Sequence, residues 1–79
     1  MAAEMLFALN GRVASTHRSV GSAVKALFDK GAPVGRSISD LQMAVERDGV
    51  VHVELTSGGQ TLPACIAHAR LANRLGLRR

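Results

Sequence analysis

Four arginines and one asparagine near the C-terminus form the strongest candidate for a functional surface. They are Arg70, Asn73, Arg74, Arg78 and Arg79. If residues 62–76 form a helix, Arg70, Arg74 and Arg78 stack along one face at four-residue steps. Residues 55–79 contain no acidic residue to neutralise them. The spacing predicts a positive ridge for an anionic partner; the alternative is a solvated basic face that suits a helix C-terminus.

A second basic candidate lies around segment 31–37, which carries two glycines and precedes a predicted helix. Backbone N–H groups at a helix N-terminus can receive a phosphate, and Arg36, with Lys30 beside the segment, would add positive charge. The glycine spacing is one residue short of a nucleotide-binding P-loop, and Arg36 replaces its lysine. The alternative interpretation is a plain turn between two helices.

The predicted order of elements over residues 5–55 is strand, helix, glycine-bearing loop, helix and strand. This order is similar to that of the K-homology RNA-binding domain. The loop reads G-x-x-x-G with Pro33 inside it, so the GxxG motif of that domain is absent. The likeness is topological, and it assigns no family.

Catalytic chemistry has little support among the remaining residues. Cys65 lies near the start of the predicted last helix, where a thiol pKa is lowered, and His68 follows three residues later. Cys65 also belongs to an apolar stripe, where free cysteine is usually a small buried hydrophobe. A zinc site would have to gather His17 or His52 from distant segments, and no two carboxylates are compelled into one cleft. The sequence therefore predicts a protein that is not an enzyme and has no metal site and no cofactor.

The N-terminal residues predict a strand or a hairpin. Residues 5–9 and 12–16 flank Asn10-Gly11, a dipeptide favoured in two-residue hairpin turns. The alternative is a helix over residues 2–9 that ends at Gly11. We favour the strands because the strand expected over residues 50–56 needs a hydrogen-bonding partner.

Two helices are expected between these strands. Apolar residues recur at helical spacing over residues 19–29, and Lys30-Gly31 supplies a basic last turn and a glycine cap. A second helix begins after a cap at Ser37 or Ser39 and runs to about residue 47. Pro33 separates the two helices.

The C-terminal third is predicted to contain one strand and one helix. Residues 50–56 alternate apolar and polar side chains, which is typical of a half-buried strand. Residues 62–76 favour a helix because Pro63 suits a first helical turn and alanine and leucine follow. The expected fold is α+β, with two or three helices on a small antiparallel sheet in the order β(β)ααβα. The alternative is a winged helix with residues 37–47 as the recognition helix.

Length and charge limit what the chain can be. Its 79 residues suffice for one domain, residues 1–79, with a modest core and few aromatic side chains, so a homodimer is a reasonable expectation. Residues 37–54 carry four acids and one arginine, whereas the flanking segments are basic. No apolar run is long enough to span a membrane, and no secretory signal is evident, so we expect a cytoplasmic location and no membrane partner.

Two functions remain open on these grounds. The first is a basic binding module that contacts nucleic acid through phosphates, without strong sequence readout, because the chain has no Tyr or Trp to stack on bases. The second is a regulatory factor, adaptor or inhibitor that docks on an acidic protein surface through the same arginines.

Overall fold

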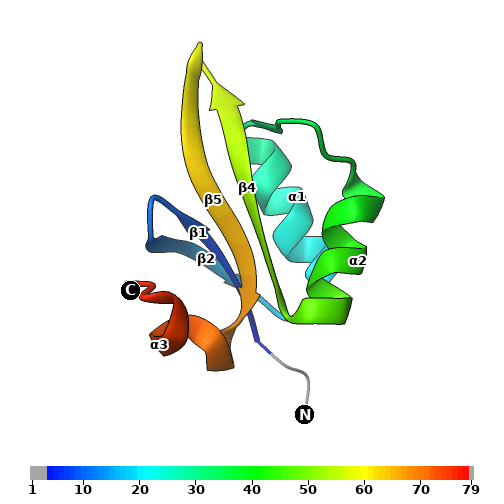
Figure 1. Cartoon of the computed structure of the whole chain (residues 1–79), viewed down its shortest axis with the longest axis vertical. Coiled ribbons are helices and arrows are strands. Elements are labelled where there is room, and N and C mark those ends of the chain that lie inside the picture. Colours follow the sequence, from blue (N-terminus) through cyan, green and yellow to red (C-terminus); the bar gives the residue numbers. More distant parts are fainter. Residues whose placement is uncertain (1–3, 79) are drawn as a thin grey trace.

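The computed structural model describes residues 4–78 and confirms an α+β fold. Its elements are β1 (Met5–Leu9), β2 (Arg12–His17), α1 (Val20–Lys30), β3 (Ala32–Pro33), α2 (Ile38–Asp48), β4 (Val50–Ser57), β5 (Gln60–His68), the 3-10 turn η1 (Ala69–Leu71) and α3 (Ala72–Leu75). The five strands form one sheet in the order β2-β1-β5-β4-β3, and neighbouring strands are antiparallel. Both long helices lie on the same side of this sheet (Figure 1).

The N-terminal hairpin is confirmed. Asn10 and Gly11 have φ angles of 55° and 79°, which are the two positive values that a type I′ turn needs. Leu9 and Arg12 close the turn as paired residues. The helical alternative is therefore wrong for residues 5–9, and residues 2 and 3 lie outside the described part of the chain.

The two helices begin and end close to where the sequence places them. Ser19 caps α1 by accepting a hydrogen bond from the N–H of Ser22. Ser37, rather than Ser39, caps α2 through a capping box, in which its hydroxyl accepts from the Asp40 N–H and its own N–H donates to the Asp40 carboxylate. Gly49 ends α2 in the left-handed conformation, with φ of 81°.

The predicted helix over residues 62–76 is wrong for most of its length. Gly58 and Gly59 have φ angles of 58° and 80°, so they form a second tight turn that sends the chain back beside β4. Residues 60–68 then pair along the whole of β4 and, on the other side, along β1. The helix in this region covers residues 72–75 alone. Strand pairing on both sides overrides the helix propensity of the alanines.

Pro63 is accommodated in β5 by its position. Its carbonyl accepts a hydrogen bond from the N–H of Asn10, so its backbone faces β1 at the point where that strand has ended. Pro63 has no N–H to donate, but no carbonyl group of β1 is left without a hydrogen bond as a result, because β1 ends at Leu9.

The core lies between the sheet and the two helices. Its buried members include Phe7 of β1, Leu27 of α1, Leu41 of α2 and Ile66 of β5. Leu41 and its buried neighbours in α2 pack on the sheet, so this helix belongs to the core of the α+β fold. The winged-helix alternative is therefore wrong. Among the described residues, no helix is long and apolar enough to cross a membrane.

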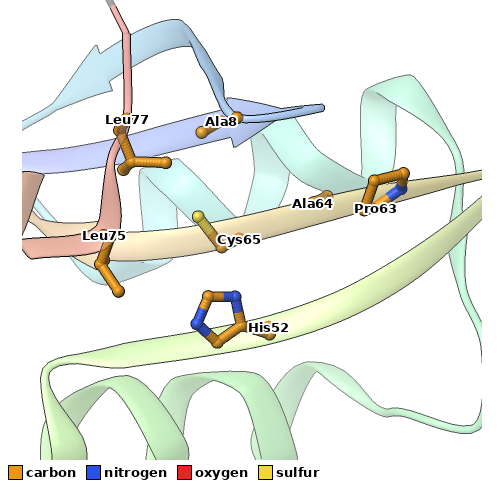
Figure 2. A pocket seen from close by; sticks show the side chains of 8 residues that line it. Ala8, His52, Pro63, Ala64, Cys65, Leu75 and Leu77 are labelled. Atoms are coloured by element: carbon orange, nitrogen blue, oxygen red, sulfur yellow. The ribbon is translucent and has the colours of Figure 1, made fainter.

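Part of the opposite face of the sheet, on β1 and β5, is also buried, which the sequence analysis did not predict. Leu6, Ala8, Cys65 and Ala67 are at most 5% exposed, yet they lie outside the core that the helices cover. The C-terminal segment, residues 69–78, crosses this second face, with Leu75 and Leu77 against it (Figure 2).

Candidate nucleic-acid interface

The arginine ridge expected on a C-terminal helix does not form. Arg70 lies in the 3-10 turn, Asn73 and Arg74 lie in the four-residue α3, and Arg78 lies beyond it in extended backbone, while Arg79 is outside the described residues. All four described residues are exposed. Their four-residue spacing therefore no longer places them on one face.

The structure brings Arg78 beside an arginine that the sequence analysis did not select. Arg12 and Arg78 form a parallel β-bridge, in which the N–H of Arg78 donates to the carbonyl of Gly11 at 2.8 Å and the N–H of Val13 donates to the carbonyl of Arg78 at 2.6 Å. Bridge partners project their side chains from the same face. We call this pair the basic corner. Only the tertiary fold brings its two members together, because 65 intervening residues separate them in the sequence.

The basic corner lies on the helix-bearing side of the sheet. Arg12 pairs with Leu9, which packs against the main core. Leu77, next to Arg78, points to the other side and contacts the second face. The corner and the second face therefore meet at Gly11, where the β1–β2 turn ends the sheet.

No carboxylate neutralises these cations within residues 4–78. The ion pair found there joins neighbours on α2, Arg47 and Asp48, at 3.0 Å. The hydrogen bond and the charge of Asp48 raise the pKa of Arg47 above its ordinary value. Arg12, Arg70, Arg74 and Arg78 are all exposed and have no such partner in the described chain.

Arg70 has a structural neighbour of its own. Its guanidinium lies 3.7 Å from the position that a Cβ on Gly49 would take, at the C-terminal end of α2. A cation is favoured at that end of a helix because the last carbonyls carry partial negative charge. Arg70 therefore has a local stabilising role that Arg12 and Arg78 lack.

Lys30 and Arg36 lie in a different region from the basic corner. Both are exposed, around the connection between α1 and α2 that contains β3. β3 and β2 are the two opposite edges of the sheet. The capping box of Ser37 and Asp40 also places a carboxylate at the N-terminus of α2, the position at which the sequence left phosphate binding open beside a plain turn. These two cations therefore do not extend the basic corner.

A small pocket opens on the second face of the sheet. It has a volume of about 140 Å³ and is lined by Ala8, Gly11, His52, Pro63, Ala64, Cys65, Leu75 and Leu77. Figure 2 shows His52 and Cys65 side by side on neighbouring strands, with Leu75 and Leu77 of the C-terminal segment across from them. The pairing of β4 with β5 around the Gly58–Gly59 turn creates this site, and the helix predicted over residues 62–76 concealed it.

The pairing of Cys65 with His68 is not observed. In a strand, residues three apart project from opposite faces, so His68 points away from the pocket that Cys65 lines. Burial raises the pKa of the Cys65 thiol, which disfavours the thiolate. Within the described residues, no three His, Cys, Asp or Glu side chains converge as metal ligands.

A serine–histidine–serine chain joins β2 to α1. The hydroxyl of Ser15 lies 2.7 Å from Nε2 of His17, and the hydroxyl of Ser22 lies 2.8 Å from Nδ1 of the same ring. The neutral imidazole can donate to one hydroxyl and accept from the other. These side chains do not line the pocket on the second face of the sheet, so we interpret them as a hydrogen-bonded connection between β2 and α1.

The fold and site define a small α+β domain with a basic corner at one edge of its sheet and an apolar pocket around the adjacent turn. Searches among protein-family models, curated proteins and solved structures find no match for this chain.

Proposed function

We propose that this chain is a non-enzymatic module that binds nucleic acid by contacting phosphates through the basic corner. The observation that carries this proposal is the bridge between Arg12 and Arg78, with no carboxylate beside it in the described chain. Like charges on paired residues destabilise a sheet, by roughly 0.2–1 kcal/mol on the scale of cross-strand pairs. A bound phosphate reverses this repulsion because each guanidinium can donate two hydrogen bonds to it.

The remaining cations of the C-terminal segment support the same proposal. Arg74 is exposed and lies four residues before Arg78, and Asn73 adds an exposed amide, whereas Arg70 lies at the C-terminal end of α2. The acidic residues of α2 lie near β4, and β1 and β5 separate β4 from the β2 edge of the sheet. An approaching polyanion is therefore attracted to the β2 edge and repelled by α2.

The test is a salt titration of binding to a labelled oligonucleotide. If about four phosphates are neutralised, the log–log slope against salt is about −3 to −4 for duplex DNA. The double variant Arg12→Gln/Arg78→Gln should bind at least about tenfold more weakly, with a slope smaller in magnitude by about one to two. Its control, Arg36→Gln/Arg47→Gln, removes the same charge elsewhere and should bind almost as the unmodified protein does.

Two results would refute the proposal. One is no detectable binding of DNA or RNA at low salt. The other is equal weakening by the corner and control variants, because binding would then depend on net charge alone. Salt-resistant capture of an acidic protein after nuclease treatment, without oligonucleotide binding, would favour the adaptor or inhibitor function instead.

A further inference from the structure

The pocket on the second face has about the volume that a single aromatic ring occupies. Its floor contains the small side chains of Ala8 of β1 and Cys65 of β5 and the backbone of Ala64, whose side chain packs in the core on the helix side, and Gly11 adds no side chain at the end near the turn. Its volume is about 140 Å³. An apolar protein cavity of about 150 Å³ is sufficient to hold benzene. The small side chains of this row leave the space that one aromatic ring fills.

One wall of this pocket is itself an aromatic ring. His52 pairs with Cys65 across β4 and β5, so both side chains project from the second face. Its imidazole is exposed, lines the pocket and makes no hydrogen bond within the described residues. Histidine rings stack on unpaired bases in nucleic-acid complexes. His52 therefore provides a stacking surface in a chain that has no Tyr or Trp.

The pocket adjoins the basic corner, because residues that line the pocket precede the two corner arginines in the chain. Gly11 and Leu77 line the pocket, and each is followed in the chain by a member of the corner, Arg12 or Arg78. The pocket and the backbone positions of Arg12 and Arg78 are thus adjacent at one turn, with the pocket on the second face and the two arginines projecting from the other. A strand that passes around this turn can place a base on one side and a neighbouring phosphate on the other.

We propose that the pocket binds one unstacked base of a single-stranded nucleic acid, with His52 stacking on it and the basic corner holding an adjacent phosphate. This inference rests on the proposed function and specifies its ligand as a single strand. A duplex keeps its bases paired and stacked, so it presents phosphates to the corner and no free ring to the pocket.

The experiment compares three ligands of equal length: a single strand, the same sugar–phosphate backbone with all bases removed, and a duplex. DNA and RNA strands of one sequence that contains only adenine, cytosine and guanine are both used, because these bases are common to the two. The unmodified protein should bind the strand with bases at least about fivefold more tightly than the abasic backbone, since stacking contributes about that much or more per base. In NMR spectra, the methyl signals of Ala8 and Leu77, which both line the pocket, should shift with the base-containing strand and not with the abasic one.

Substitutions at position 52 separate stacking from folding. His52→Ala should reduce binding of the base-containing strand to the abasic level, and His52→Phe, which keeps a flat ring, should restore it. Thr56→Ala is the control, because Thr56 is also an exposed residue on the same face of β4 and does not line the pocket. Unfolding curves of all three variants check that the fold is kept.

The outcomes distinguish this inference from the proposed function. Equal binding of the abasic and base-containing strands, or unchanged binding by His52→Ala, overturns the base pocket while leaving phosphate binding by Arg12 and Arg78 standing. Failure of every ligand to bind at low salt overturns both.

Discussion

The N–H of Arg78 donates a hydrogen bond to the carbonyl of Gly11 at 2.8 Å. This bond holds the end of the described chain against the outer edge of β2. This contact keeps Leu75 and Leu77 over the second face of the sheet. An edge strand with unpaired backbone groups can pair with other chains, and the C-terminal segment covers part of this edge. The same contact creates the basic corner.

The first prediction concerns this hydrogen bond between Arg78 and Gly11. Arg78→Pro removes the donating N–H, whereas Arg78→Ala keeps it and removes the charge alone. The proline variant should have a free energy of unfolding about 1 kcal/mol below that of the alanine variant. Urea unfolding curves measure the difference. Identical curves would show that the hydrogen bond to Gly11 contributes nothing to stability.

The second prediction concerns the start of α2. Ser37→Ala removes the hydroxyl that accepts from the Asp40 N–H at 3.2 Å and should lower the free energy of unfolding by about 1 kcal/mol. Ser39→Ala is the control, because Ser39 is exposed within the first turn and does not cap the helix. Its stability should be unchanged or slightly higher, since alanine is the better helix former. A similar loss in both variants would contradict the assigned cap.

The third prediction compares two glycines. A Cβ on Gly31 would lie 2.8 Å from the carbonyl oxygen of Thr56, so Gly31→Ala forces the α1–β3 connection away from β4 and should destabilise the protein. Gly21 lies inside α1, where a Cβ meets nothing closer than 3.8 Å. Gly21→Ala should therefore stabilise the protein by roughly 0.5–1 kcal/mol. Thermal unfolding should move the two melting temperatures in opposite directions, and a shift of both in the same direction would be inconsistent with this packing.

The fourth prediction concerns the pH dependence of stability. Burial raises the pKa of the Cys65 thiol, so the folded state retains this proton to higher pH than the unfolded state does. The stability that this contributes is fully present below the pKa of the unfolded thiol and is lost as the pH rises towards the folded one. The unmodified protein should lose stability relative to Cys65→Ala between neutral and alkaline pH. Urea unfolding at several pH values measures this, and parallel profiles for the two proteins would show that Cys65 is accessible to water.

Local features of the sequence predict most of the N-terminal two thirds. Asn10 and Gly11 both tolerate positive φ, so the first hairpin turn depends on two adjacent residues. The helices depend on apolar spacing and on caps such as Ser37, and these signals also act within a few residues. The alternation in β4 is visible because one of its faces is polar.

The prediction failed for β5 because both faces of this strand are buried at its C-terminal half. Residues 64–67 are all buried, two against the helices and two under the C-terminal segment. A strand with two covered faces shows no polar alternation, and its alanines then resemble a helix. The predicted ridge of Arg70, Arg74 and Arg78 is wrong for the same reason, because it required a continuous helix over residues 62–76.

The amino-acid sequence alone determined the α+β fold class, the first hairpin, the two long helices and the uneven charge, since each follows from composition or from neighbours along the chain. The tertiary structure alone decided that Arg12 lies beside Arg78 and that His52 lies beside Cys65. The first pair joins segments from opposite ends of the chain, so only the folded sheet brings its members together. The second pair lies on two consecutive strands of one hairpin, and it exists because residues 60–68 form a strand, which pairing on both sides decides against their helix propensity.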